Sequence, residues 1–330
     1  MGEGVTSATV AVATGLFTCA ATGAIIPVLR RANILDHPNE RSSHSTPTPR
    51  GGGIALIGVL LLAWLTLSRT GSVASGIVGI SVAAAALAVV CWIDDLRGVS
   101  PMLRLLAQGA AVTVGIFCLP EAAIVFVNWL GFLYLIGLGL LWVWWINLFN
   151  FMDGIDGLAG SEAAAIGVGM LLFATVGVGA DGESALLAAT MIGAAIGFLV
   201  WNWSPARIFL GDVGSAPLGY LLGFLLLDLA LRGFWKIALI LPLYFLADAT
   251  ITLARRLLRR ERVWRAHREH YYQQAVRHGR AHTAVVKCVI AADVLLIACG
   301  WASENGSGAV SLGLSVAIVA GLLVTLSHSR

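Results

Sequence analysis

Long apolar segments and short polar connections alternate along almost all of the 330 residues of this chain. A helix needs about 20 mainly apolar residues to cross the hydrocarbon core of a bilayer, and each segment is close to that length. The pattern predicts eleven membrane-spanning helices, at residues 5–29, 52–69, 73–93, 102–119, 131–149, 161–179, 185–203, 214–231, 234–256, 284–301 and 308–327. We therefore expect an all-α, polytopic integral membrane protein that forms a single transmembrane domain over residues 1–330.

Composition agrees with a location in the lipid bilayer. Hydrophobic residues make up 58% of the chain and charged residues only 12%, whereas soluble domains carry about 25% charged residues. The first apolar segment has no basic residue before it and runs into Pro27 and Arg30, so we interpret it as a retained span rather than a cleaved signal. The five cysteines lie in or beside apolar segments without a C-x-x-C spacing, and we expect no disulfide.

Basic residues predict the orientation of the chain, because short connections rich in Lys and Arg stay in the cytoplasm. With the N-terminus outside, all of the 21 Lys and Arg residues except Arg69, Arg232 and Lys236 fall on the cytoplasmic side. The cytoplasmic connections are then 30–53, 94–104, 147–162, 203–214 and 255–283. The net charge of +3 is concentrated between residues 255 and 287, which suits anionic lipid headgroups or an anionic substrate and does not require nucleic acid.

Acidic residues recur at the ends of apolar segments on this predicted cytoplasmic side. The sites are Asp94 with Asp95, Asp153 with Asp156, and Asp212. Two predicted spans separate each site from the next, so the chain returns to the same side each time. Carboxylates at a membrane edge are costly, and oxygen ligands from three connections can surround one hard cation. The sequence therefore predicts metal-assisted chemistry on a phosphate at this surface.

The segment N-L-F-N-F-M-D-G-I-D-G-L-A-G at 147–160 is the strongest of these signals. It supplies oxygens at steps of three, from Asn150, Asp153 and Asp156, among glycines that permit tight turns. The alternative is a Gly/Asp-rich turn between two spans. A calcium loop would need a glutamate twelve positions from its start, and none is present, so magnesium with a phosphorylated substrate fits better.

Structural alternatives also exist for the other acidic sites. Asp94 and Asp95 can mark a helix end that reaches water, with Arg97 as a solvated partner. Asp212 lies between Gly211 and an apolar span, and it is compatible both with capping that helix and with binding a metal.

Two basic segments complement the acids. In A-H-R-E-H, the spacing of His267 and His270 places them on one helical face, and we expect them to bind phosphate together with Arg268. Zinc would need a third or fourth ligand, and the alternative is a solvated basic loop. In P-R-G-G-G, Arg50 precedes a glycine triplet that opens the second span, where free backbone N–H groups around Gly52 favour an anion.

Together, D-H-P-N-E-R-S-S-H-S-T-P-T-P-R-G-G-G, W-I-D-D-L-R, the segment at 147–160, F-L-G-D-V-G-S and A-H-R-E-H-Y-Y-Q resemble the polyprenyl-phosphate N-acetylhexosamine-1-phosphate transferases. The resemblance spans residues 36–273. It implies ten or eleven spans, commonly a homodimer, in the bacterial inner (plasma) membrane with a cytoplasmic active site. Such enzymes transfer a sugar 1-phosphate from a UDP-sugar to undecaprenyl phosphate, release UMP and use Mg²⁺, with Mn²⁺ as an alternative.

The same resemblance implies roles for individual residues. Asp94 and Asp95 would position or deprotonate the lipid phosphate, and Asp94 is the candidate base. Asp212 and Asn150 look like the magnesium ligands. Arg104 stands where the family often has a lysine, and a guanidinium differs from an ammonium in geometry.

Other residues would hold the nucleotide sugar. Asp153 and Asp156 would shape the nucleotide and metal site, while the histidine motif would grip the diphosphate through His267, Arg268 and His270. The peptidoglycan-precursor branch, which uses UDP-MurNAc-pentapeptide, typically carries three consecutive histidines where this chain has H-R-E-H. The resemblance therefore favours a UDP-N-acetylhexosamine and the enzymes that initiate O-antigen (lipopolysaccharide) or exopolysaccharide synthesis.

Two alternatives to this reaction remain at this stage. One is phospho-MurNAc-pentapeptide transfer. The other is an ion-coupled transporter, which would need acids near the middle of the bilayer in broken helices. Only Asp228, Asp248 and Asp293 approach that description, and Asp248 can simply face a helix bundle.

Overall fold

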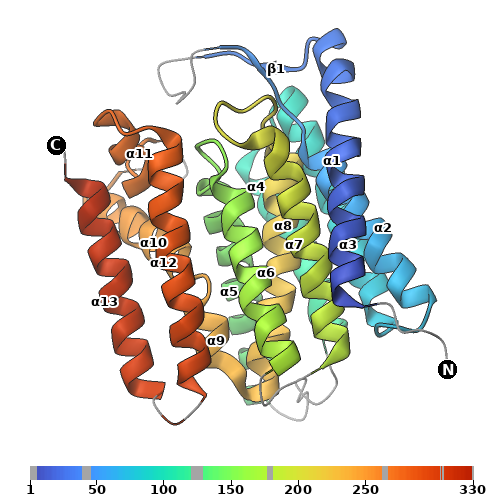
Figure 1. Cartoon of the computed structure of the whole chain (residues 1–330), viewed down its shortest axis with the longest axis vertical. Coiled ribbons are helices and arrows are strands. Elements are labelled where there is room, and N and C mark those ends of the chain that lie inside the picture. The colour runs from blue at the N-terminus through green and yellow to red at the C-terminus, as the bar shows by residue number, and fades with distance from the viewer. Residues whose placement is uncertain are drawn as a thin grey trace.

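The apolar segments of the chain are helical, and most of the helices run side by side, as Figure 1 shows. The structure is a computed structural model that describes residues 6–38, 46–119, 129–176, 181–261, 267–304, 306 and 308–328. Parts of two predicted site connections, 39–45 and 262–266, lie outside the described residues. The all-α membrane fold expected from the sequence is confirmed.

The helices are α1 (Ser7–Arg31), α2 (Gly53–Arg69), α3 (Gly76–Arg97), α4 (Pro101–Phe117), α5 (Trp129–Phe151), α6 (Leu158–Val176), α7 (Gly182–Asn202), α8 (Asp212–Leu229), the π-helical turn η2 (Ala230–Phe234), α9 (Trp235–Ile240), α10 (Leu243–Leu258), α11 (Tyr271–Arg277), α12 (His282–Ser303) and α13 (Gly308–Ser327). Two short antiparallel strands, β1 (Leu35–Asp36) and β2 (Thr48–Pro49), join α1 to α2. The sequence pattern did not predict these strands.

Eight helical segments among the described residues are long and apolar enough to cross a membrane. They comprise α1, α3, α5, α6, α7, the continuous stretch Asp212–Ile240, α12 and α13. The apolar helices α2 and α4 are shorter, at 17 residues each. The protein is therefore multi-pass, while the predicted count of eleven spans is not confirmed.

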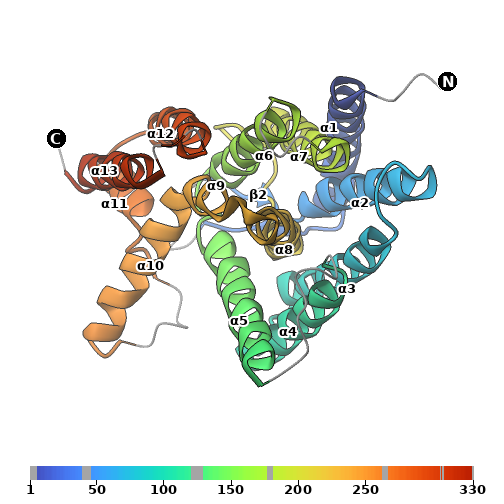
Figure 2. The same cartoon turned by 90° about the horizontal axis from the view of Figure 1, so that it is seen from below.

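The segment predicted as one span at 234–256 is divided in the structure. Helix α9 ends at Ile240 and α10 begins at Leu243, with Leu241 and Pro242 between them. Proline has no N–H to donate and its ring clashes with the preceding turn, so a helix rarely continues through it. Beyond this break α10 leaves the bundle and extends outward, as Figure 2 shows.

Helix α8 lies at the centre of the bundle, with α2, α3, α5 and α9 around it in Figure 2. Every residue from Val213 to Leu229 is buried. The indole of Trp142 on α5 stacks on Tyr220 of α8, with ring centroids 4.9 Å apart, and its Nε1 donates a hydrogen bond to the Tyr220 carbonyl at 3.0 Å. Asp212, the first residue of α8, is therefore held in position by a tightly packed helix.

Helices α2 and α8 are in close contact at their first turns. A Cβ atom on Gly53 would lie 2.1 Å from the Gly214 Cα. Small residues allow such backbone contacts in membranes, where dispersion and close packing hold helices together.

We expect Gly53→Ala to destabilise the protein by about 1–3 kcal/mol, because the methyl group forces α2 away from α8. The displacement would also move Asp212, the first residue of α8. Gly58→Ala is the matched control, since a Cβ on Gly58 meets nothing within 4 Å. Thermal unfolding in detergent micelles measures both variants, and equal midpoints would contradict the packing argument.

Candidate active site

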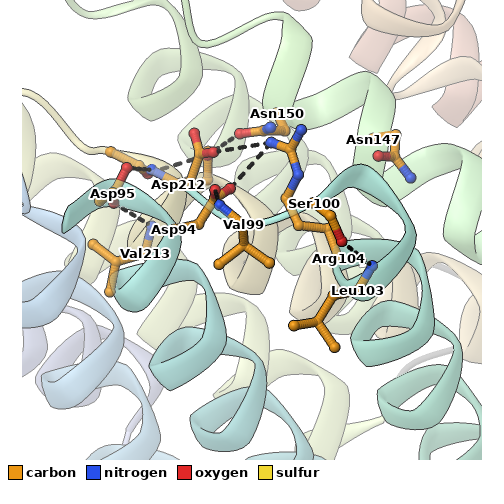
Figure 3. A network of polar contacts seen from close by, with 12 residues as sticks. Asp94, Asp95, Val99, Ser100, Leu103, Arg104, Asn147, Asn150, Asp212 and Val213 are labelled. Atoms are coloured by element: carbon orange, nitrogen blue, oxygen red, sulfur yellow. Dashed lines mark hydrogen bonds and ion pairs between the residues drawn. The ribbon is translucent and has the colours of Figure 1, made fainter. Parts of the chain in front are cut away.

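Three aspartates from two helices meet at the end of the bundle that carries β1, as Figures 1 and 3 show. Asp94 and Asp95 lie in the last turn of α3, and Asp212 is the first residue of α8. Their side chains are 8%, 1% and 22% exposed, in that order. Of the three carboxylates, that of Asp212 is therefore the most accessible to a ligand.

Asp95 acts as the cap of α8 although it belongs to α3. Its Oδ1 accepts a hydrogen bond from the Asp212 N–H at 3.1 Å, and its Oδ2 accepts one from the Val213 N–H at 2.9 Å. The residue at the cap position itself is Gly211, which has no side chain to do this. Helix N-terminal N–H groups need such acceptors, so Asp95 fixes where α8 begins.

Gly211 makes this arrangement possible. Its φ of +76° lies in the left-handed region that favours glycine, and a Cβ there would come 2.8 Å from Asp95 Oδ2. A side chain at 211 would therefore displace the capping carboxylate. Asp212 does not cap its own helix, and its carboxylate is left to face Arg50 and Arg104.

Arg50 connects two of the carboxylates. Its Nη2 lies 2.6 Å from Asp95 Oδ1 and 3.2 Å from Asp212 Oδ1. A backbone bridge between Arg50 and Phe209 places it beside the start of α8. Although burial opposes ionisation, the charges of Asp95 and Asp212 raise the pKa of Arg50, so its guanidinium remains charged.

Arg104 on α4 joins the other side of the cluster. Its Nη1 lies 3.1 Å from Asp94 Oδ2 and 3.6 Å from Asp212 Oδ2. The second oxygen of Asp94 accepts a hydrogen bond from the Val99 N–H at 2.6 Å, which fixes the turn between α3 and α4. Both Asp94 oxygens therefore already have partners, and Asp94 orients Arg104.

The end of α5 brings the predicted segment 147–160 to the same cluster. The Ser215 hydroxyl of α8 contacts Asn150 Oδ1. Asp153 follows in the turn before α6. Burial raises its pKa well above the ordinary value for aspartate, and the negative charge of Asp212 raises it further. Because the charge of Asp212 acts on Asp153, Asp153 belongs electrostatically to the cluster.

Asp156, expected beside the nucleotide and metal, has other partners. Its Oδ2 lies 3.3 Å from His282 Nδ1 on α12 and accepts a hydrogen bond from the Ala206 N–H at 3.1 Å. Although burial opposes it, the hydrogen bond and charge of His282 lower the Asp156 pKa. The structure thus shows Asp156 joining the turn before α6 to α12 and to the connection before α8.

A cavity of about 620 Å³ begins at this cluster and extends between α4, α5 and α10. Arg104, Asn150 and Asp212 line its polar end. The remaining wall is largely apolar and includes Leu105, Leu140, Val143, Trp144, Leu253 and Leu257. Several of these side chains are exposed on the helix bundle, so the cavity is a groove that opens sideways towards the membrane.

The histidine segment lies on the other side of the α5 end. His267 and His270 have ring centroids 4.9 Å apart, and the His270 ring stacks near Phe151, which lines the groove. The predicted helical face is wrong, because α11 begins only at Tyr271 and both histidines precede it. The two histidines lie close together in the non-helical segment that precedes α11. This segment is held beside the end of α5 because the Tyr272 hydroxyl donates a hydrogen bond to the Phe151 carbonyl at 2.8 Å.

Asp248 on α10 holds this histidine segment and was not predicted as a site residue. Its carboxylate is fully buried and accepts hydrogen bonds from the backbone N–H groups of Tyr271 at 3.0 Å and Tyr272 at 3.3 Å. The Tyr244 hydroxyl donates to it at 3.2 Å, and His270 Nδ1 lies 3.2 Å away. A carboxylate with so many donors fixes the ring of His270 in one orientation.

Gly52 and Arg268 have other neighbours in the structure than the sequence suggested. The N–H of Gly52 donates to the Phe209 carbonyl at 2.8 Å, and its neighbours in the glycine triplet are bonded to the same connection. Those N–H groups are therefore not free for an anion. Arg268 lines a separate polar cavity with Arg255 and Arg277, on a different side of α10 from the groove.

The donor set fits magnesium better than zinc. Among the described residues, no three His, Cys, Asp or Glu side chains are grouped so that they could hold a metal ion. Zinc needs three or four protein ligands, whereas magnesium commonly takes one or two protein oxygens and completes its shell with water and substrate phosphate. Asp212 and Asn150, at the polar end of the groove, offer such oxygens.

Comparison with known proteins agrees with this geometry. The family model for glycosyl transferase family 4 matches residues 77–230. A phospho-N-acetylmuramoyl-pentapeptide-transferase of Synechococcus sp. is 30% identical over 324 residues, which cover 86% of this chain and 88% of that protein. A probable undecaprenyl-phosphate N-acetylglucosaminyl 1-phosphate transferase of Bacillus subtilis is 29% identical over 287 residues, covering 78% and 75%.

A third relative matches a smaller share. A decaprenyl-phosphate N-acetylglucosaminephosphotransferase of Mycobacterium leprae is 30% identical over 237 residues, covering 65% of this chain and 59% of that protein. The names of these relatives share transfer of an amino-sugar phosphate and differ in the sugar and the lipid.

Proposed function

Because the chain belongs to glycosyl transferase family 4, the family of polyprenyl-phosphate hexosamine-1-phosphate transferases, we propose that it transfers N-acetylhexosamine 1-phosphate from a UDP-sugar to undecaprenyl phosphate. The products are UMP and a lipid-linked sugar that initiates a cell-surface polysaccharide. The observation that carries this proposal is the groove, whose apolar wall ends at Arg104, Asn150 and Asp212. A polyprenyl phosphate has the same division into an apolar chain and an anionic head.

In this proposal the lipid phosphate enters at the polar end of the groove, where Arg104 contacts it. Asp94 orients Arg104 through its ion pair. An oxygen of the lipid phosphate then attacks the sugar-linked phosphorus, and the bond from that phosphorus to the UMP oxygen breaks. UMP leaves, while the bond between the sugar C1 and its oxygen stays intact. Because both Asp94 oxygens are engaged, we assign it positioning rather than proton removal.

Asp212 and Asn150 would hold the magnesium ion. When bound, such an ion offsets the charge of the phosphates and stabilises the departing oxygen. Arg50 would keep the Asp212 carboxylate in place from the opposite side. His267 and His270 would contact the diphosphate of the UDP-sugar, since their segment lies beside Phe151 at the groove.

We further propose that the site faces the cytoplasm of the bacterial plasma membrane and that the N-terminus lies outside. The distribution of basic residues supports this orientation. Among sugars, H-R-E-H and the N-acetylglucosamine named for two of the relatives favour UDP-N-acetylhexosamines over UDP-MurNAc-pentapeptide. A role in O-antigen or exopolysaccharide synthesis, and a homodimer, remain predictions.

The direct test is UMP release by the purified protein in detergent or lipid nanodiscs. Undecaprenyl phosphate would be supplied with a panel of UDP-N-acetylhexosamines and UDP-MurNAc-pentapeptide, with and without Mg²⁺. We expect UMP only when lipid, metal and an N-acetylhexosamine donor are all present. Release with the pentapeptide donor alone would favour the peptidoglycan branch, and no release with any donor would refute the function.

Binding of the UDP-sugar should be accompanied by proton uptake at His267. Burial, together with the nearby His270 and Arg256, lowers the pKa of free His267 to about 4, so the ring is neutral near pH 6. A diphosphate beside the ring favours its charged form and raises this pKa. The uptake therefore occurs between the free and bound pKa values, and affinity falls as pH rises across that interval.

Titration calorimetry at pH 6 in buffers of different ionisation enthalpy measures this uptake. His267→Gln should reduce it, whereas His328→Gln at the exposed end of α13 should not. Identical proton uptake by the wild type and His267→Gln would remove His267 from the diphosphate site.

A further inference from the structure

A second polar cavity, of about 430 Å³, lies between the C-terminal end of α10 and α11. Every side chain that lines it is polar, and four of them are the arginines Arg255, Arg259, Arg268 and Arg277. Glu269 is the only acid among the described residues that line it. Among the described residues, this cavity and the groove share no lining residue, so it is a separate site.

The single acid does not neutralise the cavity. Glu269 is already paired with Arg256 and with Arg259, whose Nη2 lies 2.8 Å from Glu269 Oε2. Glu261, which does not line the cavity, pairs with the same two arginines, so the charges of Arg255, Arg268 and Arg277 exceed those of the acids. Arg256 and Arg259 lower the pKa of Glu269 although its partial burial opposes this, so it remains an anion bound to its partners. The guanidinium carbon of Arg255 lies 5.1 Å from the centroid of the Tyr271 ring. Arg277, on α11, also lines the cavity. The cavity thus carries a net positive charge suited to a phosphate group.

The position of the cavity indicates which kind of phosphate would occupy it. Leu257 and Leu258, at the end of α10, are 66% and 84% exposed. Large exposed leucines on a helix that projects from a membrane bundle belong in lipid, as the outward course of α10 in Figure 2 indicates. The arginines beside them then lie at the depth of the phospholipid headgroups, where the cytoplasmic leaflet is anionic.

We propose that this cavity binds the phosphate headgroup of an acidic phospholipid, and that the bound lipid fixes the position of α10. Helix α10 separates the two sites. Arg255 and Arg259 line the basic cavity on one side, and the groove on the other side is lined by Leu253, Ala254 and Leu257. A headgroup held by the arginines therefore sets the width of the groove. In this way the composition of the membrane would regulate the proposed reaction. The part of the test that measures activity therefore rests on the proposed function.

The binding arm of the test does not depend on catalysis. The probe is dioleoyl-phosphatidylglycerol added to detergent-purified protein, with dioleoyl-phosphatidylcholine as the neutral lipid, and the readout is the thermal unfolding midpoint. We expect phosphatidylglycerol to raise the midpoint and phosphatidylcholine to leave it unchanged. The double variant Arg255→Gln/Arg277→Gln should bind phosphatidylglycerol roughly 30-fold more weakly, the effect of two arginines near a membrane surface.

A matched control removes two charges elsewhere on the same side. Arg30→Gln/Arg31→Gln changes exposed residues at the end of α1, and it should keep the full response to phosphatidylglycerol. If the double variant at the cavity does not fold, Arg277→Glu alone tests the same site on the short surface helix α11. An equal response in cavity variant and control would overturn the proposal.

Inorganic phosphate separates a headgroup from a free anion. If phosphate at millimolar concentration raises the midpoint while phosphatidylglycerol does not, the cavity holds a free phosphate and the lipid proposal is wrong. In nanodiscs, UMP release by the wild type should be severalfold faster with phosphatidylglycerol than with phosphatidylcholine alone. Loss of that ratio in the cavity variant supports control through α10, while an unchanged ratio contradicts it. If no variant releases UMP but the binding arm succeeds, the proposed function fails and the lipid site stands.

Discussion

Asp212→Asn should reduce UMP release by about 10³-fold or more while the protein remains folded. The substitution keeps the shape of the side chain and removes the charge that would bind a hard cation and that now pairs with Arg50 and Arg104. The hydrogen bond that begins α8 uses the Asp212 backbone N–H and the Asp95 carboxylate, so it survives the change. Turnover at saturating and limiting Mg²⁺, with the unfolding midpoint, measures the effect.

Asp181→Asn is the matched control for this variant. Asp181 is also an aspartate at a helix start, where it caps α7, and it also pairs with an arginine, Arg232, at 2.7 Å. It lies near the opposite ends of the helices, and asparagine caps helices as well as aspartate, so the change should cost at most about 1 kcal/mol from the exposed ion pair and leave transfer intact. Near-normal turnover of Asp212→Asn at limiting Mg²⁺ would show that this carboxylate does not bind the metal.

Asp248→Asn should lower kcat/KM for the UDP-sugar by about 10- to 100-fold, the range for residues that orient a binding group. The two carboxylate oxygens accept from the N–H groups of Tyr271 and Tyr272 separately. An amide has only one oxygen, so one N–H would face an NH₂ group and remain unsatisfied. His270 would then lose the partner that holds its ring.

Kinetics distinguish this positioning role from a general loss of stability. The KM for the UDP-sugar should rise while the KM for undecaprenyl phosphate stays constant, because the groove residues keep their contacts. Tyr244→Phe removes one donor from the same carboxylate and should have a small effect. In a double-mutant cycle, Asp248→Asn and His270→Ala should be strongly non-additive. Additive effects, or equal changes in both KM values, would mean that Asp248 acts only on the fold.

Most of the fold could be predicted because the thickness of a bilayer sets the length of each apolar segment. The last predicted span, 308–327, coincides with α13, and most of the others lie within a few residues of a helix. The α9–α10 segment was predicted incorrectly as one span because apolar residues predominate on both sides of Pro242. Pro242 was the available signal for the break, and hydropathy alone does not register it.

The candidate site was predictable in its residue types and less so in its contacts. The grouping of Asp94, Asp95 and Asp212 followed from their position at one end of the bundle. The capping of α8 by Asp95 depends on how α3 packs against α8, which no local pattern contains. Asp248 was not predicted as a site residue because it lies within a mainly apolar segment. Its role depends on the later segment around Tyr271, which folds back onto it. His282 gave no signal because its partner, Asp156, is far away in sequence.

If the groove holds a polyprenyl phosphate as proposed, its sideways opening determines which parts of that lipid the protein can distinguish. A closed tunnel would measure the whole chain and reject molecules of the wrong length, whereas the walls at Leu140 and Leu257 are 66% exposed and leave the far end of a chain in the bilayer. Selection then acts on the phosphate and the first few isoprene units, and chain length beyond them is not read. The acceptor also arrives by diffusion within the plane of the membrane, so its surface density, rather than its concentration in solution, sets how often the groove is filled.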